Sequence, residues 1–532
     1  MDTNDGLDYD VVTNIDILFF HFRQFLQNAP QQLDREEGDA LQYLINYLIQ
    51  EFDEKHQAMG QTFASGIVTR STLKYLFKRG DVVVFHEDRS ISGAKLKSFE
   101  ATTKDEMHIV AESYAFDGKF YLQEKKRDLR LPRSIHNELA TEINSLPCYP
   151  ILFAAAEVKE RLDKRGHRFW KCRQLAYVAY NGPNAKKDTD YTNTRFLVDV
   201  RTYQTIYGDR ISPHHSKVEL DDKLMSDEEP PAELVYMVPE NIFGFDIQEK
   251  KWVDIEVDNI SDIQWNKNAF KTLAIEDESK ELVNALVNNK INADKATDTV
   301  MGKGNGLILL LHGGPGTGKT LTAESVAEIA EKPLYRVTCG DIGTEPRQVE
   351  EYLQKVFYLG KIWDCVVLLD EADVFLEQRT LADLTRNALV SVFLRTLEYY
   401  DGILILTSNR VGTFDEAFKS RIQLALHYKK LDRAQREHIW TNFLDRLKDL
   451  GENFNEREIR DKINVLSAYE MNGRQIRNAI TTARQLALFR KTALSWNHLE
   501  HSIKVSGQFD KYLEEVHNQI KDDDMAREEG WR

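Results

Sequence analysis

The first 66 residues place apolar positions at helical spacing. Residues 15–26 contain four phenylalanines, and residues 41–52 repeat leucine and isoleucine three and four positions apart. This spacing puts apolar side chains on one face of a helix, and such faces usually pack on the core. We therefore predict a helical segment over residues 1–66.

From residue 67 the pattern changes to short strands. Residues 82–85 form one apolar run, and Asp117-Gly118 separates two more in the manner of a tight hairpin. The polar stretch 181–193 predicts an exposed loop. We predict a β-rich domain over residues 67–245, followed by a linker over residues 246–300.

After the linker, apolar runs alternate with helical stretches. The runs cover residues 307–311, 334–338, 366–369 and 403–406. Strands that are apolar throughout and separated by helices form a parallel sheet that is covered on both faces. We therefore predict an α/β domain over residues 301–430.

Only helical patterns follow residue 428. Asp432 and Gln435 stand at capping-box spacing, and Gly451 marks the end of the helix that they begin. We predict an all-α domain over residues 431–532.

A glycine-rich stretch joins the first apolar run of the α/β domain to a helical pattern. It reads Gly313-Gly314-Pro315-Gly316-Thr317-Gly318-Lys319-Thr320, and Leu321 follows it. A strand, a glycine loop and a helix in this order are the context of a phosphate-binding loop. Glycines let backbone N–H groups turn inward around an anion, and the helix N-terminus favours negative charge. We predict that these residues bind a nucleoside triphosphate, that Lys319 reaches the outer phosphates and that Thr320 holds Mg²⁺.

Polar residues follow two other apolar runs. Asp370 and Glu371 end the run 366–369, and carboxyl ends of parallel strands are where α/β proteins bind ligands. Asp370 is a carboxylate ligand of the kind that Mg²⁺ prefers. Glu371 is placed to polarise an attacking water. Asn409 follows the run 403–406, where its amide could orient that water or touch the γ-phosphate.

Composition limits the classes of partner. The formal net charge of −16 argues against broad nucleic-acid binding, which needs a positive field. Four cysteines without C-x-x-C spacing favour a reducing compartment. No apolar run approaches the ~18 residues of a membrane span. We expect no nucleic acid, no membrane span, and a cytoplasmic location with the nucleus as the alternative.

Four motifs in a fixed order resemble those of the AAA family of ATPases. They are the glycine loop, the 366–373 stretch with its Asp-Glu-Ala-Asp, the stretch 407–410 and the stretch 414–421. The similarity spans about residues 265–505. The whole chain resembles filamentous-fungal AAA proteins with a β-rich N-terminal domain of unassigned function.

The resemblance implies a P-loop NTPase sheet with a C-terminal helical lid, and it assigns roles. Asn409 matches the residue called sensor 1. Arg421 matches the arginine finger, which acts on the nucleotide of a neighbouring subunit and implies a homo-oligomer, most often a hexameric ring. Arg477 matches the nucleotide-sensing arginine of the lid better than Arg474 does.

The chain departs from the family pattern at two positions. Asp341 stands where members that thread polypeptides have an aromatic residue, and Leu424 replaces a second arginine. We therefore expect an ATP-hydrolysing machine that remodels a protein client or adaptor bound by the N-terminal half. A nucleotide-switched scaffold with slow hydrolysis is the alternative, and a nucleic-acid-dependent ATPase is a weaker one.

Overall fold

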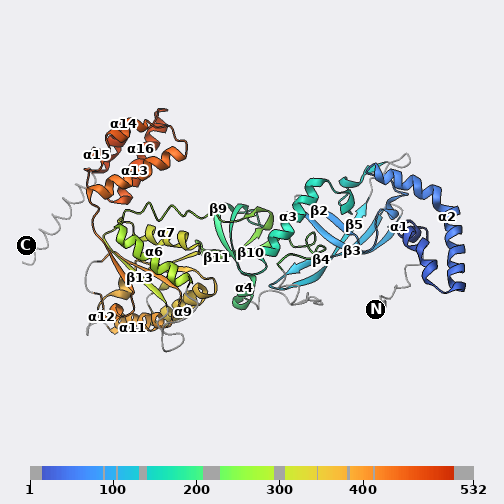
Figure 1. Ribbon diagram of the computed structural model, residues 1–532, viewed down its shortest axis with the longest axis horizontal. Coiled ribbons are helices and arrows are strands. Elements are labelled where there is room, and N and C mark those ends of the chain that lie inside the picture. Colours follow the sequence, from blue (N-terminus) through green and yellow to red (C-terminus); the bar gives the residue numbers. More distant parts are fainter. Residues whose placement is uncertain are drawn as a thin grey trace, which may run out of the picture. The chain divides into compact units, whose positions relative to one another are not determined.

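The chain divides into two compact units, residues 1–263 and 264–532, whose elements are labelled in Figure 1. The computed structural model describes residues 15–87, 90–103, 106–130, 140–207, 228–292, 306–343, 345–379, 384–410 and 414–507.

The first unit begins with the two predicted helices, α1 (Ile15–Asn28) and α2 (Arg35–Ala64). Asp34 caps α2 by accepting a hydrogen bond from the Glu37 amide at 3.0 Å. A small apolar cluster of Phe19, Ile45 and Leu48 packs the helices together.

A five-stranded antiparallel sheet follows, in the order β5-β4-β3-β2-β7. Its strands are β2 (Val82–Glu87), β3 (Ser90–Thr103), β4 (Glu106–Phe116), β5 (Phe120–Arg130) and β7 (Cys148–Pro150). The predicted hairpin at Asp117-Gly118 is confirmed, because it joins β4 to β5. A separate pair joins β1 (Ile67–Val68) to β6 (Thr141–Glu142).

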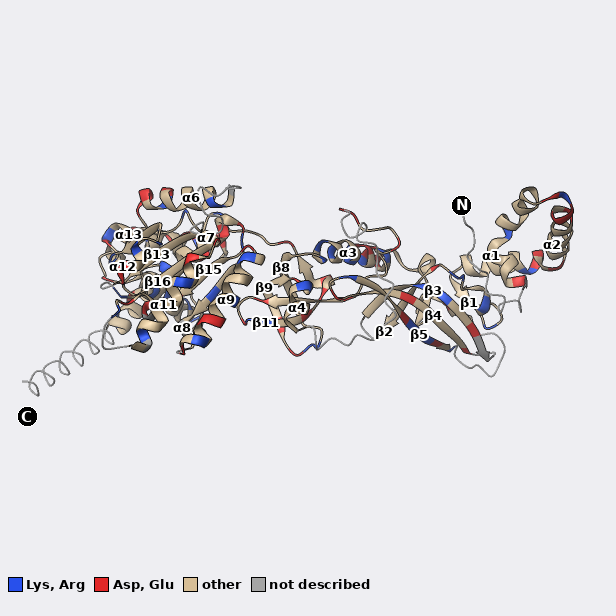
Figure 2. Cartoon of the chain, turned by 90° about the horizontal axis from the view of Figure 1, so that it is seen from below, with Lys and Arg blue, Asp and Glu red and all other residues tan. Residues whose placement is uncertain are grey.

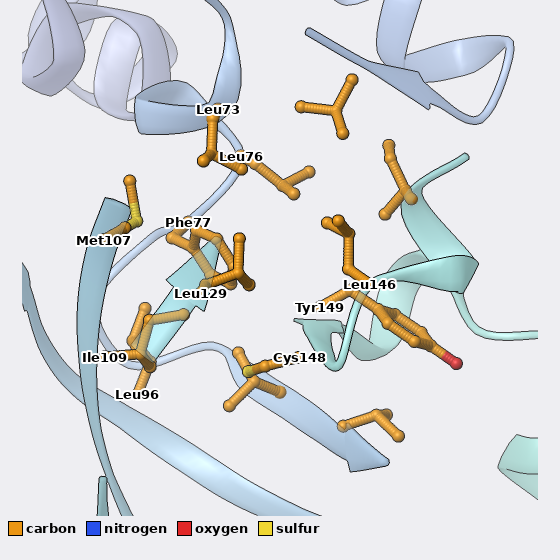
Figure 3. Close-up of a cluster of buried hydrophobic side chains, with 14 of the residues drawn as sticks. Leu73, Leu76, Phe77, Leu96, Met107, Ile109, Leu129, Leu146, Cys148 and Tyr149 are labelled. Atoms are coloured by element: carbon orange, nitrogen blue, oxygen red, sulfur yellow. The ribbon is translucent and has the colours of Figure 1, made fainter. Parts of the chain in front are cut away.

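One face of this sheet is buried. Residues on β4 alternate between buried and half-buried positions, as expected for a strand with one face on a core. Figure 3 shows side chains such as Phe77, Met107 and Leu129 pointing toward one another within the buried cluster. This core gives the β-rich part its own hydrophobic centre.

A second antiparallel sheet has the order β11-β10-β9-β8-β12. It contains β8 (Ala176–Pro183), β9 (Asp190–Val198), β10 (Asn241–Asp246), β11 (Lys251–Glu256) and β12 (Ile260–Ser261), with helices α3 (Ala156–Cys172) and α4 (Val200–Tyr207) beside it in the chain. The predicted loop over residues 181–193 is too long, because only residues 184–189 lie between β8 and β9. Both strands extend into it past a β-bulge, and the turn is held locally by Asn184 and Asp188.

Helix α3 contains six lysines and arginines, which Figure 2 shows as a largely blue stretch. Three of them converge on one residue. Arg161 and Arg165 bind the Asp258 carboxylate, and Arg168 donates to the Asp258 carbonyl at 2.7 Å. Arg165 is 2% exposed, so much of this positive charge is used inside the first unit.

The second unit is built on a parallel sheet of order β14-β15-β16-β13-β17. The strands are β13 (Leu307–Gly313), β14 (Leu334–Thr338), β15 (Val366–Asp370), β16 (Ile403–Ser408) and β17 (Leu424–Tyr428). The four predicted strands are confirmed. β17 was not predicted, because its apolar run, residues 424–426, is short and is followed by His427.

Helices cover both faces of this sheet, as predicted. The longer ones are α6 (Asp277–Asn292), α7 (Lys319–Ala330), α9 (Pro346–Ile362) and α11 (Leu384–Glu398), and the short ones are α8 (Cys339–Ile342), α10 (Asp373–Leu376) and α12 (Glu416–Lys419). Alternate strand residues such as Leu309 and Leu368 face α6 and α7 in one core cluster. On the other side, α9 packs on β15 and α11 packs on α9.

The C-terminal lid is helical and includes α13 (Arg433–Asp449), α14 (Glu456–Asp461), α15 (Ile463–Leu466) and α16 (Gly473–Phe489), and the described residues 496–507 are helical as well. They share a core that includes Trp440 and Ile476. The predicted capping box of Asp432 and Gln435 begins α13, and Gly451 follows its end with φ +67°. Among the helices within the described residues, none is long and apolar enough to cross a bilayer.

Candidate functional site: a phosphate-binding loop and its acidic partners

The glycine loop lies between β13 and α7, at the carboxyl edge of the sheet. Gly313 has φ +147°, and a Cβ there would lie 2.1 Å from the Tyr428 carbonyl oxygen of β17. Gly318 caps α7 with φ +105°, a conformation that glycine adopts without a side-chain clash. The first amides of α7 have no partners within the helix, so this end can bind an anion.

Lys319 begins α7 and is only 6% exposed. Its ammonium donates to the carbonyls of Gly313 and Gly314 at 2.8 and 2.7 Å. Burial lowers the pKa of Lys319, while Asp370 and other nearby carboxylates oppose that shift. The cation is thus held against the loop whose amides would bind phosphate.

Thr320 and Asp370 meet directly under the loop. The Thr320 hydroxyl lies 3.2 Å from Asp370 Oδ1. Thr320 is on α7 and Asp370 is at the end of β15, so the fold brings together residues that are 50 positions apart in the chain. Asp370 is 6% exposed, and the buried Thr407 of β16 donates to it at 2.5 Å. The structure therefore brings both predicted metal ligands together.

These oxygen atoms suit Mg²⁺. That ion prefers hydroxyl, carboxylate and water oxygens, and it usually takes only one or two carboxylates from the protein. One hydroxyl and one carboxylate converge here beside the N-terminus of a helix of 12 residues. The donor set thus fits a magnesium ion shared with a nucleotide.

Glu371 has an unusual backbone. Its φ is +58°, a region that residues other than glycine seldom occupy and that costs about 1–3 kcal/mol. The Glu371 amide donates to Thr407 Oγ1 at 2.9 Å, which ties this conformation to β16. Such local strain is typical of functional sites, and here it turns the chain sharply after the buried strand.

Asn409 lies opposite Glu371. Its Nδ2 is 3.5 Å from Glu371 Oε1, the limit of a hydrogen bond. Asp373 holds the Asn409 backbone by accepting from its amide at 3.1 Å and from the Ser408 hydroxyl. The predicted base and the predicted water-orienting amide thus face one another.

The lid touches the loop through the start of α16. The Gly473 amide donates to the Gly316 carbonyl at 3.0 Å. Gly316 has φ +72°, and a Cβ there would lie 2.6 Å from the side chain of Asn472, which caps α16. Only glycine fits this contact at position 316, so loop and lid meet without a side chain between them.

Two exposed arginines of α16 act on different parts of the site. Arg474 adds to the lowering of the Lys319 pKa, so its charge reaches the loop lysine. The charge of Arg477 acts instead on Glu324 of α7. Desolvation raises the pKa of Glu324, and the charges of Arg336 and Arg477 lower it. The charge of Arg474 therefore reaches Lys319, whereas our prediction selected Arg477 as the nucleotide-sensing residue.

Arg421 is bound by residues nearby in the same chain. Its guanidinium donates to the Ala417 carbonyl at 2.8 Å and to Glu398 Oε2 at 3.3 Å. No described contact joins it to Lys319, Thr320 or Asp370. Among the described contacts, the structure therefore does not bring Arg421 to the other predicted residues, and its role on a neighbouring subunit stays a prediction.

The two departures from the family pattern have structural roles. Asp341 accepts hydrogen bonds from the Thr338 amide and hydroxyl, which makes it the capping-box residue of α8. Leu424 begins β17 and is half-buried. Both residues serve local folding in this chain.

Arg336 was missed by the sequence analysis. Its Nη2 lies 2.6 Å from Asp370 Oδ2, across the pairing of β14 with β15. The only signal in the sequence is a single charged residue in an otherwise uncharged strand, and the pairing of that strand with β15 comes from the sheet order.

Three protein families match the chain. Residues 309–429 match "ATPase family associated with various cellular activities (AAA)", and residues 431–520 match "Fungal AAA+ ATPase lid domain". Residues 59–155 match "Domain of unknown function (DUF7025)". The first two matches fall on the sheet with its loop and on the lid.

The chain is also similar to individual proteins. It is 30% identical to human ATPase family AAA domain-containing protein 3B over 25% of this chain and 21% of that protein. It is 32% identical to ATPase family AAA domain-containing protein 3 of Caenorhabditis elegans over 27% of this chain and 25% of that protein. The chain therefore spans about a quarter of the length of these curated relatives.

Among solved structures, the FIGL-1 AAA domain in complex with ADP is 19% identical, with a TM-score of 0.35, over 46% of this chain and 87% of that one.

Proposed function

We propose that this chain, which belongs to the AAA family of ATPases, hydrolyses ATP with Mg²⁺ and uses the energy to remodel a protein client. Thr320 and Asp370, 3.2 Å apart beside the glycine loop, support the ATP–Mg²⁺ part of this proposal most directly. One hydroxyl and one carboxylate in that position would hold the Mg²⁺ of a bound nucleotide. The magnesium would draw charge from the outer phosphates.

The loop residues Gly313 to Leu321 would bind the phosphates through backbone amides and the Lys319 ammonium. Lys319 would exchange its bonds to the loop carbonyls for phosphate oxygens. Glu371 would take the proton of the attacking water, and Asn409, 3.5 Å from it, would orient that water.

Arg421 would complete the site of the next subunit. The finger would leave Glu398 and place its charge beside the transferring phosphoryl group, an effect of roughly 10³–10⁵ in rate. We propose a homo-oligomer, a hexameric ring by family resemblance. The lid would respond to the bound nucleotide through the contact of Gly473 with the loop. Arg477, or alternatively Arg474, would be the residue that senses the nucleotide.

The N-terminal half would bind the client or adaptor, in the cytoplasm or the nucleus. Its two sheets form a compact unit with cores of their own. The basic residues of α3 that converge on Asp258 are engaged in internal contacts, which leaves less of this positive charge for a nucleic acid.

A nucleotide-switched scaffold is the second candidate, and Asp341 favours it. Polypeptide threading in the family uses an exposed aromatic at this place, and here the residue caps α8. On this account, ATP orders the oligomer and slow hydrolysis resets it.

Steady-state phosphate release with and without cell extract separates these functions. A rate that rises with extract and stays unchanged with added DNA or RNA supports client remodelling. A slow rate that extract does not change supports the scaffold. Stimulation by nucleic acid alone would contradict both.

A further inference from the structure

The carboxylate proposed to hold Mg²⁺ is already paired with a cation of the same chain. Arg336 Nη2 lies 2.6 Å from Asp370 Oδ2, within the range of a charge-assisted hydrogen bond. The Thr320 hydroxyl lies 3.2 Å from the other oxygen, Oδ1, and Thr407 donates to that oxygen as well. Both oxygens of Asp370 are therefore engaged.

A guanidinium in this position opposes a metal ion. It uses a lone pair of the oxygen that Mg²⁺ or its bound water would need, and its positive charge repels the dication at short range. Asp370 is buried, so water screens this repulsion less than it would at the surface. The pair with Arg336 must therefore weaken metal binding for as long as it persists.

Arg336 has a second carboxylate within electrostatic reach. Its side chain is 52% exposed, so it can move without opening the core. Glu324 projects from the exposed side of α7, where the charge of Arg336 acts on it. Within the described part of the chain, Glu324 has no hydrogen-bond or ion-pair partner.

We propose that Arg336 competes with Mg²⁺ for Asp370, and that metal binding requires the guanidinium to turn from Asp370 toward Glu324. This inference rests on the proposed ATP–Mg²⁺ function. Arg336 would act as a positioning residue that sets the Mg²⁺ concentration at which the site is half-saturated.

The test uses the full chain with Glu371→Gln, which stops turnover, and the fluorescent nucleotide mant-ATP as probe. Affinity for mant-ATP is measured in EDTA and across a Mg²⁺ series. Arg336→Met should leave the affinity in EDTA unchanged within about twofold. It should lower the half-saturating Mg²⁺ concentration about fivefold to tenfold, as expected when a competing state of about 1 kcal/mol is removed.

Two further variants define the effect. Lys361→Met also removes a cation, because Lys361 forms an ion pair with Asp401. Asp401 comes before β16, so this pair lies at the amino ends of the strands, away from the glycine loop. The half-saturating Mg²⁺ concentration of this variant should not change. Glu324→Gln removes the carboxylate toward which Arg336 would turn and should raise the half-saturating Mg²⁺ concentration. That rise should disappear when Arg336→Met is added.

An unchanged half-saturating Mg²⁺ in a folded Arg336→Met variant would overturn the inference. So would weaker mant-ATP binding in EDTA without a gain in Mg²⁺ affinity, since Arg336 would then bind phosphate. If Arg336→Met does not fold, a Glu324→Gln variant with unaltered Mg²⁺ dependence overturns it equally. Absence of mant-ATP binding in the parent chain, with and without Mg²⁺, would contradict the proposed function itself.

Discussion

The Gly473 amide donates a hydrogen bond to the Gly316 carbonyl at 3.0 Å, so the lid helix α16 begins directly on the phosphate-binding loop. A change in the position of the loop must therefore move the first turn of α16. The contact gives nucleotide binding a short route to the lid, within a single chain.

Asn472→Ala tests that route. Asn472 caps α16 and lies against Gly316, so its loss should cost about 1 kcal/mol of local stability and weaken mant-ATP binding about fivefold. Asp432→Ala is the matched control, because Asp432 caps α13 with the same capping box and has no described contact with the loop. Equal mant-ATP affinities in the two variants would show that the contact does not influence the site.

Arg421→Ala should act on neighbouring subunits. If the finger works in trans, mixing equal amounts of variant and wild-type chains should lower phosphate release well below half, because wild-type sites lose their finger too. Arg395→Ala, which removes a surface ion pair with Glu350 on the same unit, serves as the control. Activity that only follows the fraction of wild-type chain would place Arg421 outside the neighbour's site.

Asp258→Asn should destabilise the first unit. It leaves the buried Arg165 without its bidentate partner, which we expect to cost about 2 kcal/mol, less than for fully buried pairs because Asp258 is 19% exposed. Peptide-resolved hydrogen exchange would measure this unit separately. Glu160→Gln, which breaks an exposed pair with Lys164 on α3, should leave the exchange unchanged.

The same pair predicts a pH dependence. Burial raises the pKa of Asp258, but the bonds from Arg165 and Arg161 outweigh it and hold the pKa below the ordinary 3.8. A depressed carboxyl pKa stabilises the fold above pH 3.8 and loses that effect as the pH falls through the folded pKa. The stability difference between wild type and Asp258→Asn should be constant from pH 7 to about 5 and shrink below 3.8. A difference that grew on acidification would contradict the ion-pair account.

Much of the fold could be predicted because its signals are local. Continuous apolar runs specify the parallel strands, and Asp432 with Gln435 specifies a helix start through hydrogen bonds to near neighbours. β17 could not be predicted in this way, since its strand character comes from pairing with β13. The stretch 181–193 is mostly polar, so its sequence resembles a loop, and only pairing across the hairpin makes its two ends part of β8 and β9.

The site divides in the same manner. The glycine loop, Asp370 and Glu371 are recognisable from their places after apolar runs, and the structure brings Thr320 to Asp370 as expected. Arg336 and Asn472 reach the site through sheet order and lid packing, which no local pattern contains. The predicted domain limits, the roles of the site residues and the action of Arg421 in trans stay predictions.

Glu371→Gln tests the central claim most directly. We predict that the purified full chain releases phosphate from ATP only when Mg²⁺ is present. The variant should bind mant-ATP as tightly as wild type and lose turnover by roughly 10²–10⁴, the worth of a general base. Near-normal turnover in Glu371→Gln, or no Mg²⁺-dependent phosphate release by the wild-type chain, would contradict the account.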